Sequence, residues 1–579
     1  MMRTIENGKL RKEHVGQQVQ LIGWVAKKRN FGQLVFIDLR DRTGICQLVF
    51  DESFAEKTKD IKNEYVIQVS GNVVARKDVN PDLATGDVEV QVSDCTIIND
   101  AKTTPLIIAD QTDALEDTRL EYRYLDLRRP MMQEKLKMRH QISRSMRQYL
   151  DDHDFIEVET PMLGKSTPEG ARDYLVPSRV HPGSFYALPQ SPQLYKQLLM
   201  ISGLERYYQF ARCFRDEDLR ADRQTDFTQV DIETSFLNEE EIQTMMEEMM
   251  VKVMKEVKGI DVAMPFKRMF YQEAMDTYGS DKPDDRFGMQ LQDCSHIFEN
   301  TEFNVFKGVL ENGGCIKGFV VNDFSSITRK NIDAFTEVAK KNGAKGLVVL
   351  KCQDNECTGS ARKFISDAEI QELYSFFGLK DGDVLFIVSD QWNTTCQALG
   401  ALRNDIGEQL GLKKKDEFSF LWVTDFPMFE YSEEFQRYQS QHHPFTQPKT
   451  EDIPLLDTDI TKVRTNAYDI VLNGYELGGG SLRIHDNNLQ KKIFEILGMS
   501  QEEIQDKFGF FVDAFQYGTP PHGGIAFGLD RIAMILSESD SIRDVIAFPK
   551  NAKATCPMSH APTPVDPKQL EELQIKTQE

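Results

Sequence analysis

Residues 212–233 constrain the fold of this chain more than any other segment. Apolar and polar residues alternate in 207–214 and again in 227–232, a period of two that is typical of half-buried β-strands. The loop between them is of mixed charge and too rich in Arg and Asp to be buried. Within it, the planar guanidinium of Arg215 can bridge a carboxylate and a phosphate at once. An exposed hairpin covered by solvated salt bridges is the alternative interpretation.

Two further segments carry related patterns. In residues 522–531, reading HGGIAFGLDR, a strand runs into Gly528 and a helix follows. Free backbone donors at the start of that helix, together with Arg531, suit the phosphates of a nucleotide. In residues 138–150 the apolar side chains recur at helical spacing, and residues 155–161 then alternate as a strand that ends in proline.

These three segments resemble the signature motifs of the class II aminoacyl-tRNA synthetases. Residues 214–217, reading FRDE, resemble motif 2. Residues 522–531 resemble motif 3, with Ala526 where the class often has glycine, and residues 138–161 resemble motif 1. The resemblance implies an antiparallel catalytic sheet. It also implies a homodimer, because motif 1 is a dimer-interface element in that class.

The N-terminal region reads as a small barrel. Five short apolar runs, at residues 18–25, 34–39, 45–50, 65–74 and 88–98, suit the strands of an OB-fold. Basic side chains beside Phe36 provide the charge and stacking that unpaired RNA bases need. A barrel with basic rims and no ligand is the alternative. With the three motifs, the region resembles the anticodon-binding domain of subclass IIb synthetases, which implies anticodon contacts from Arg29, Phe36 and Gln47.

The resemblance is to the bacterial-type aspartyl-tRNA synthetases of that subclass, because the segment inserted between motifs 2 and 3 resembles their GAD domain. We therefore predict a multidomain α+β protein: an OB-fold barrel plus a class II catalytic domain with an inserted α/β domain. The 579 residues suit about four domain-sized units. The predicted divisions are 1–104 (barrel), 105–130 (hinge), 131–282 and 416–555 (the two catalytic parts), 283–415 (GAD) and 556–579 (C-terminal extension).

Local patterns predict several further elements. Residues 239–258 form a methionine-rich helix whose apolar stripe indicates core packing. Residues 326–341 form an amphipathic helix and 346–350 a buried strand. A short helix is expected in the tail. The basic residues of the predicted hinge either contact tRNA or face water.

The choice of amino acid depends on two cations. Lys196 and Arg483 can pair with the side-chain carboxylate of aspartate, whereas a lysine pocket would place acids there and an asparagine pocket would gain nothing from the charge. The resemblance assigns Asp231 and Glu169 to the substrate ammonium group. It also places Gln193 near the substrate, and His442 and His443 in a loop that closes over it. A surface turn or a metal site is the alternative for the adjacent histidines.

The resemblance implies ATP as co-substrate, with Arg215 and Arg531 as the catalytic residues. Arg215 is expected at the α-phosphate and Phe227 against the adenine. Asp469 and Glu476 suit Mg²⁺, a hard ion that prefers oxygen ligands. The complete set of expected ATP-binding residues is Arg215, Asp216, Glu217, Gln224, Phe227, Glu476, Gly528, Leu529, Asp530 and Arg531.

Composition argues against several other classes of protein. The net charge of −23 argues against a generic nucleic-acid binder, although local patches decide RNA affinity. No run is apolar enough to span a membrane and the N-terminus has no signal-peptide core, so a cytoplasmic protein is expected. Of the nine cysteines only Cys352 and Cys357 come close, at a spacing that makes a poor zinc site, and reduced thiols are the simplest account.

The expected activity is activation of L-aspartate as aspartyl-adenylate and its transfer to tRNA(Asp). Charging of tRNA(Asn) as well is the open alternative. Many strict relatives have leucine and many relaxed ones histidine where Phe31 stands in the loop 29–33, and phenylalanine matches neither. An inactive paralogue that binds RNA is disfavoured because the motif arginines are present. An asparaginyl enzyme is disfavoured by Lys196 and by the inserted domain.

Overall fold

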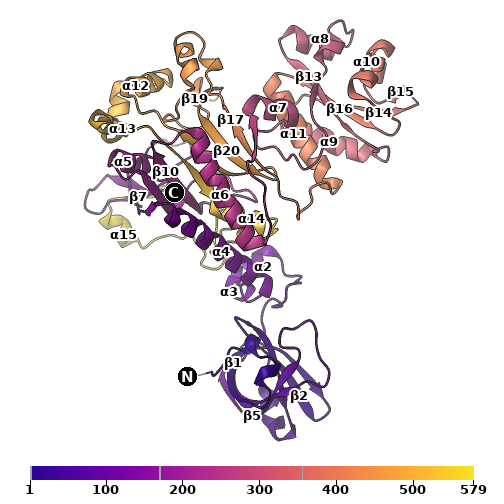
Figure 1. Cartoon of the computed structure of the whole chain (residues 1–579), viewed down its shortest axis with the longest axis vertical. Helices are drawn as coiled ribbons and strands as arrows, with labels where there is room; N and C mark the ends of the chain where they lie inside the picture. The colour runs from indigo at the N-terminus through magenta and orange to yellow at the C-terminus, as the bar shows by residue number, and fades with distance from the viewer. Residues whose placement is uncertain (1–2, 168–170, 355, 434, 579) are drawn as a thin grey trace. The chain divides into compact units, whose positions relative to one another are not determined.

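The computed structural model describes residues 3–167, 171–354, 356–433 and 435–578 (Figure 1). The chain divides into two compact units. One comprises Met1–Glu134, Ala547–Asn551 and Thr555–Thr563, and the other comprises Lys135–Ile546, Ala552–Ala554 and Pro564–Glu579. In the part of the chain that the structure describes, no helix is long and apolar enough to cross a membrane. The finer six-part division given above stays a prediction.

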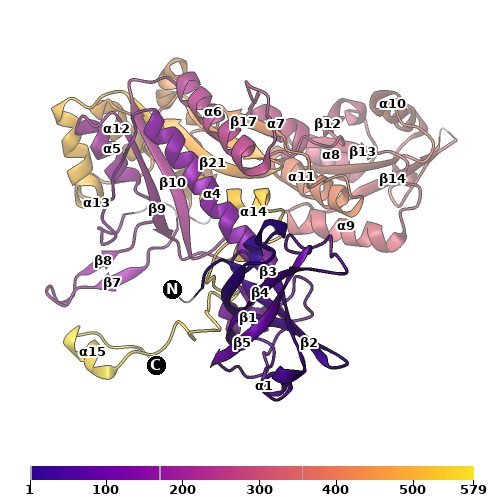
Figure 2. The ribbon, with the colours of Figure 1, turned by 60° about the horizontal axis from the view of Figure 1, so that its bottom comes forward.

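The first unit contains a closed five-stranded barrel, which confirms the predicted OB-fold (Figure 2). Its strand order is β1-β2-β3-β5-β4, and the bounds are β1 Gln18–Phe31, β2 Leu34–Asp41, β3 Gly44–Phe50, β4 Val66–Ala75 and β5 Val88–Asn99. Buried apolar side chains such as Leu21, Ile37 and Leu48 fill the interior. Strand β1 is longer than predicted because it pairs with β2 out to Phe31 and Leu34. The predicted loop 29–33 is therefore the end of a hairpin, turned at Gly32 with a φ of 60° that suits glycine.

The predicted hinge contains two short helices, α2 Glu116–Glu121 and α3 Arg123–Asp126. Asp126 is fully buried, and its carboxylate accepts hydrogen bonds from Arg119, Arg123 and Arg129. Burial raises the pKa of Asp126, but the arginines outweigh it and the pKa is lowered. We expected these basic residues to contact tRNA or face water. For Arg123 and Arg129 the structure corrects this, because their side chains are buried and neutralise a buried acid.

The second unit is organised around an eight-stranded sheet of order β11-β17-β20-β21-β22-β10-β9-β6. Its pairs are antiparallel except β11–β17 and β6–β9, one at each edge. The predicted hairpin and the predicted strand before Gly528 are both confirmed. The bounds are β6 Ile156–Glu157, β9 Arg206–Phe214, β10 Asp226–Ser235, β11 Lys267–Phe270, β17 Phe420–Thr424, β20 Ala467–Leu472, β21 Tyr475–Leu482 and β22 His522–Gly528.

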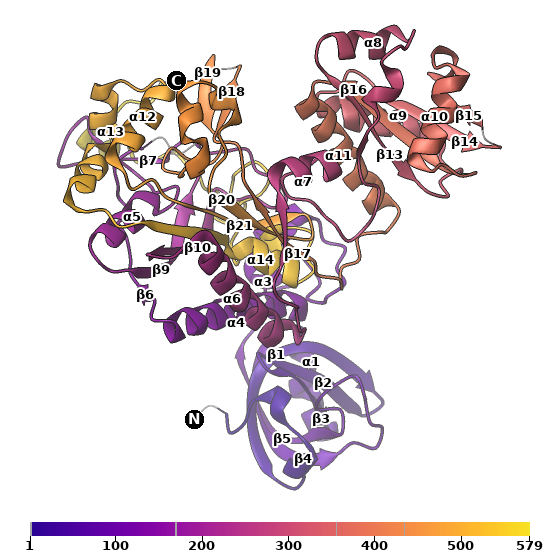
Figure 3. The ribbon, with the colours of Figure 1, turned by 45° about the horizontal axis from the view of Figure 1, so that its top comes forward.

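Three helices cover one face of this sheet: α4 Pro130–Asp152, α6 Glu239–Lys258 and α14 Leu529–Leu536 (Figure 3). Buried residues of all three helices pack against Val230 and Ile232 of β10. Helix α6 has the predicted bounds and ends at Gly259, and its buried methionines confirm the predicted core packing. Because side chains alternate along a strand, Asp231 and Glu233 point to the opposite face. That face holds the candidate site.

The strand after α4 is shorter than predicted. Only Ile156 and Glu157 pair, with Tyr207 and Tyr208 of β9, although the alternation continues to Pro161. Strand β6 lies at the edge of the sheet, and beyond Glu157 the Val158 amide makes a further bond to the Tyr208 oxygen of β9 before the chain leaves the strand. Ile156, Met162 and Leu163 are consequently exposed.

The described residues of the inserted segment form their own five-stranded sheet, of order β12-β13-β16-β14-β15, with four α-helices. The predicted helix is present as α9, which begins after the N-cap Thr328, and the predicted strand as β14. The bounds are β12 Gln292–Asp293, β13 Cys315–Val321, β14 Val348–Gln353, β15 Glu356–Thr358, β16 Val384–Asp390, α8 Asn304–Glu311, α9 Arg329–Lys341, α10 Asp367–Phe377 and α11 Trp392–Gln409.

The remaining elements include two small hairpins and the expected short helix in the tail. Their bounds are α1 Ala55–Asp60, β7 Leu175–Pro177, β8 Phe185–Ala187, α5 Gln193–Ile201, α7 Tyr271–Tyr278, β18 Phe429–Ser432, β19 Arg437–Ser440, α12 Asn487–Ile496, α13 Gln501–Ala514 and α15 Pro567–Glu572.

Candidate active site

Four buried charges meet where α5 packs on the sheet. The ammonium nitrogen of Lys196, on α5, lies 3.0 Å from Asp231 Oδ1 and 3.4 Å from Glu233 Oε2. Arg483, the residue after β21, donates from Nε and Nη2 to the two oxygens of Glu233 at 2.9 and 3.1 Å. Each of the four side chains is at most 2 % exposed. The fold thus brings side chains that are 35 to 250 residues apart in the sequence into one ionic cluster.

Glu233 was missed by the sequence interpretation. It lies two residues after Asp231 on a strand whose apolar residues Val230 and Ile232 face the core, so alternation alone would have placed both acids on one face. Burial raises the pKa of Glu233, but the cations of Arg483 and Lys196 outweigh it and the pKa is lowered. For Asp231 burial prevails and the pKa is raised. Glu233 is therefore the permanent counter-ion of the two cations.

Two of the predicted substrate-binding side chains keep hydrogen-bonding atoms unused. Asp231 Oδ2 and Gln193 Nε2 are buried and, among the described residues, have no hydrogen-bond partner. Buried polar atoms are nearly always satisfied, so an unused acceptor and an unused donor beside one cluster indicate a ligand site. Glu169, the other residue predicted to bind the ammonium group, lies outside the described residues.

The adjacent histidines face different partners. His442 Nε2 lies 3.3 Å from Asp469 Oδ1, whereas His443 Nε2 lies 2.7 Å from Nη1 of Arg483. Burial and the nearby Arg483 hold the pKa of His443 well below its usual value. Burial lowers the pKa of His442 too, but the hydrogen bond to Asp469 outweighs it and the pKa is raised. The two rings contact different partners, so among the described residues they do not form a shared metal site.

Asp469 and Glu476 come together on neighbouring strands, as predicted. A Cβ added at Gly479 would lie 2.7 Å from Asp469 Oδ1 and 3.6 Å from Glu476 Oε1, so the absence of a side chain there leaves room for both carboxylates. Burial raises the pKa of Asp469 to about 6, because the nearby positive charge does not offset the loss of hydration. Within the described ranges, no group of three His, Cys, Asp or Glu side chains could hold a metal.

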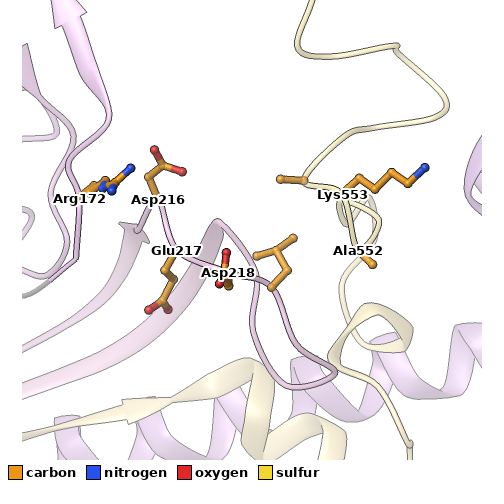
Figure 4. A pocket seen from close by; sticks show the side chains of 8 residues that line it. Arg172, Asp216, Glu217, Asp218, Ala552 and Lys553 are labelled. Atoms are coloured by element: carbon orange, nitrogen blue, oxygen red, sulfur yellow. The ribbon is translucent and has the colours of Figure 1, made fainter.

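The loop after β9 forms one wall of a cavity of about 540 Å³. Arg172, Asp216, Glu217 and Asp218 face Ala552 and Lys553 across it (Figure 4). Deeper along the hairpin, the guanidinium carbon of Arg215 lies 5.1 Å from the ring centroid of Phe227. The expected phosphate-binding and adenine-binding side chains are therefore neighbours. Glu217 pairs with Arg223 at 3.3 Å, and Gln224 is buried.

The helix start after β22 is held by two contacts of Arg531. Its Nη1 donates to the backbone oxygen of Glu476 at 2.5 Å, and its Nη2 pairs with Asp222 at 3.2 Å. The Asp530 carboxylate is buried and accepts from the Thr228 amide and from Arg139. Because the Leu529 and Asp530 side chains are both buried, contact with a nucleotide at these positions would come from the backbone.

The predicted anticodon residues share the outer face of the barrel. Arg29 pairs directly with Phe36 across β1 and β2, and Asp38 pairs with Gln47 across β2 and β3. Arg29 Nη2 donates to Asp38 at 2.6 Å and to Gln47 at 3.1 Å. Sequence interpretation missed Arg76 and Glu89, which also bond the Gln47 side chain. Phe31 lies beyond them at the hairpin end and is 77 % exposed.

Comparison with known proteins identifies the family. The family model described as tRNA synthetases class II (D, K and N) matches residues 115–552, and one described as an OB-fold nucleic acid binding domain matches residues 19–98. The chain belongs to the class II tRNA synthetases of the D, K and N group.

Individual relatives span the whole of this synthetase. The aspartate–tRNA ligase of Macrococcus caseolyticus is 54 % identical over 99 % of this chain and 98 % of its own length. The aspartate–tRNA(Asp/Asn) ligase of Bacillus mycoides is 56 % identical with the same coverage. Among solved structures, asparaginyl-tRNA synthetase from Pyrococcus horikoshii, complexed with asparaginyl-adenylate, has a TM-score of 0.60 at 19 % identity and covers 95 % of this chain and 98 % of its own. That likeness shows the shared fold.

Proposed function

We propose that this synthetase is an ATP-dependent aspartate–tRNA ligase. The observation that carries the proposal is the buried cluster of Lys196, Arg483, Asp231 and Glu233, with Asp231 Oδ2 still unpaired. Glu233 balances one of the two cations, so the cluster can accept a further carboxylate. Asp231 Oδ2 offers an acceptor for the substrate ammonium group. A substrate with one ammonium and one extra carboxylate, aspartate, matches this distribution of charge.

Arg483 would bind that carboxylate through Nη1. Its Nε and Nη2 are committed to Glu233, whereas Nη1 faces Ser481 Oγ at 2.6 Å and His443 Nε2 at 2.7 Å. The neutral His443 ring can move away from Nη1 without exposing a charge. Lys196 would supply the second cation.

ATP would bind along the β9–β10 hairpin and the start of α14, with Arg215 and Arg531 at its phosphates and Phe227 against the adenine. Mg²⁺ would be held by Asp469 and Glu476, which approach each other beside Gly479, and further oxygens would come from water or phosphate. When bound, the ion would neutralise charge on the polyphosphate. Attack of the aspartate carboxylate on the α-phosphorus releases pyrophosphate, and the terminal ribose hydroxyl of tRNA then takes the aspartyl group. Orientation and charge neutralisation by Arg215 and Arg531 account for the acceleration.

The barrel would read the anticodon through Arg29, Phe36 and Gln47. The enzyme would charge tRNA(Asp) and, as the alternative, also tRNA(Asn), which the names of several relatives include. A homodimer is also proposed, because Ile156, Met162 and Leu163 are 50, 38 and 51 % exposed beside the edge strand β6.

The nine cysteines are all free in the structure, which suits a reducing cytoplasm. We further assign the inserted sheet to a GAD domain.

The decisive test is aspartate-dependent ATP–pyrophosphate exchange by the purified protein, with asparagine and lysine as competing substrates. Exchange with aspartate alone is expected, followed by charging of purified tRNA(Asp). An Arg531→Ala variant should fold and bind tRNA yet barely form adenylate. Exchange supported equally by asparagine would contradict the proposed pocket.

A further inference from the structure

Cys352 and Cys357 face each other directly in the inserted sheet. They are register partners on β14 and β15, and their sulfur atoms lie 2.9 Å apart. Both are buried, at 2 and 3 % exposure, in the apolar cluster on one side of that sheet. From this geometry we propose that the pair is a modification site, at which a peroxide converts the two thiols into a reversible cross-strand disulfide.

The backbone hydrogen bonds show that the pairing of β14 with β15 suits a disulfide between these two residues. The amide and carbonyl of Cys352 bond to Asp383 and Gly382, on the side away from β15. Cys352 and Cys357 are therefore a non-hydrogen-bonded antiparallel pair, in which the Cα atoms are about 4.5 Å apart and the side chains are closest. Disulfides span Cα separations of about 4.4–6.8 Å, so the bond needs no change of register.

The two thiols are not equivalent. The thiol of Cys352 can donate to the sulfur of Cys357, which lowers the pKa of Cys357 despite burial, and the charge of Arg362 acts in the same direction. The pKa of Cys352 is raised correspondingly. Because Cys357 lies on the edge strand β15, we assign it as the thiolate that reacts first and Cys352 as the resolving thiol.

The chemistry is balanced with one hydrogen peroxide. The Cys357 thiolate attacks one peroxide oxygen, the O–O bond breaks, and the hydroxide that leaves is protonated to water. Cys352 then attacks the sulfur of the resulting sulfenic acid, the S–S bond forms and the S–O bond breaks. The hydroxyl group leaves with the proton of the Cys352 thiol as a second water. Two thiols are oxidised and one peroxide is reduced.

Access to the buried pair comes from its place in the sheet. Strand β15 has three residues, lies at the edge, and pairs only with β14 among the described strands. Glu356 and Thr358, on either side of Cys357, are exposed. Short edge strands open locally at low free-energy cost, which admits a small oxidant such as peroxide. Tyr374 of α10 donates to the backbone oxygen of Glu356 at 2.8 Å and keeps the closed strand in register.

The test uses the full chain. The protein is treated with hydrogen peroxide, its remaining thiols are blocked with a maleimide under denaturing conditions, and the digest is analysed by mass spectrometry without reductant. We expect a crosslinked peptide pair containing Cys352 and Cys357, two hydrogens lighter than the reduced pair, and two fewer blocked thiols than the nine of the untreated chain. Reductant should restore all of them.

Matched variants separate this pair from general oxidation. Cys357→Ser should lose the crosslink, whereas Cys294→Ser, which changes another buried cysteine of the same apolar cluster, should retain it. Amide exchange of β15 should slow severalfold in the oxidised wild type and stay unchanged in treated Cys357→Ser. A wild type that keeps nine thiols would overturn the proposal. So would a crosslink that joins Cys315 to Cys396 on the neighbouring elements β13 and α11.

Discussion

Arg483 and Glu233 form a bidentate ion pair inside the catalytic unit, with nitrogen–oxygen distances of 2.9 and 3.1 Å. The pair holds the guanidinium in one orientation, with Nη1 directed towards His443. Pre-orientation of this kind lowers the entropy lost when a substrate carboxylate binds. Glu233 has no proposed contact with the substrate, but it orients Lys196 and Arg483, which do.

Replacing Glu233 should therefore impair both stability and substrate binding. In Glu233→Gln, Lys196 and Arg483 lose a buried counter-ion, which typically lowers the free energy of unfolding by about 3–5 kcal/mol. Urea denaturation measures this loss, and pyrophosphate exchange should show a raised KM for aspartate. Asp226→Asn, on the same strand, removes a partly exposed ion pair with Arg212 and should cost about 1 kcal/mol or less. Equal losses in the two variants would contradict the role of Glu233.

Lys196→Leu should abolish recognition of aspartate more than binding of ATP. A lost buried partner of about 3–5 kcal/mol corresponds to roughly two to four orders of magnitude in aspartate-dependent exchange. ATP affinity, measured by calorimetry, should stay nearly unchanged. The control is Lys252→Leu on α6, whose lysine pairs with Glu256 at the surface. Near-normal exchange in Lys196→Leu would remove this lysine from the pocket.

Gly479→Ala tests the proposed metal site without removing a carboxylate. The added methyl group would lie 2.7 Å from Asp469 Oδ1, so Asp469 must shift away from Glu476. We expect the Mg²⁺ concentration for half-maximal exchange to rise by about tenfold, on the order of 1.4 kcal/mol of lost binding. Gly346→Ala, where a Cβ meets nothing within 4 Å, is the matched control. An unchanged Mg²⁺ dependence in Gly479→Ala would place the ion elsewhere.

Stability should fall in acid partly because of His522. Burial lowers its pKa from 6.5 to about 4 against the opposing effect of Glu233, while Arg483 and His485 add to the lowering. As the pH falls from 6.5 to 4, the unfolded chain binds a proton here that the folded chain does not, so the folded state loses about 3 kcal/mol. Between these two pH values, His522→Gln should lose less of its free energy of unfolding than the wild type, by that amount, as measured by urea titration. Parallel curves for the two proteins would exclude this contribution.

Phe31 should influence the choice between the two tRNAs. Its ring is 77 % exposed at the end of the β1–β2 hairpin, so replacement should leave the fold intact. Phe31→Leu and Phe31→His are expected to shift the ratio of tRNA(Asp) to tRNA(Asn) charging in opposite directions. Aspartate activation without tRNA should be the same in all three proteins. A ratio that stays constant would place discrimination at other residues.

Local sequence patterns predicted most of the elements because they depend on neighbours a few residues apart. The alternation around Phe227 and Val230 and the methionine stripe of α6 each specify an element and its buried face. The proximity of Asp469 and Glu476 was also predictable, because both lie on strands joined by the short turn at Asn473 and Gly474. In each case the deciding contacts are close along the chain or follow from a simple period.

Tertiary structure decided which partner each charged or reactive side chain meets. The sequence by itself determined an OB-type barrel and a class II sheet, and it predicted that Lys196 and Arg483 share a substrate pocket. It did not determine that Glu233 joins those two cations, or that His442 and His443 contact different partners. Nor did it determine that the Asp126 arginines turn inwards, that β6 ends after two residues, or that the thiols of Cys352 and Cys357 meet. The physical reason is that these contacts join elements distant in sequence, and the free energy of a buried charge or thiol depends on what the whole fold packs around it.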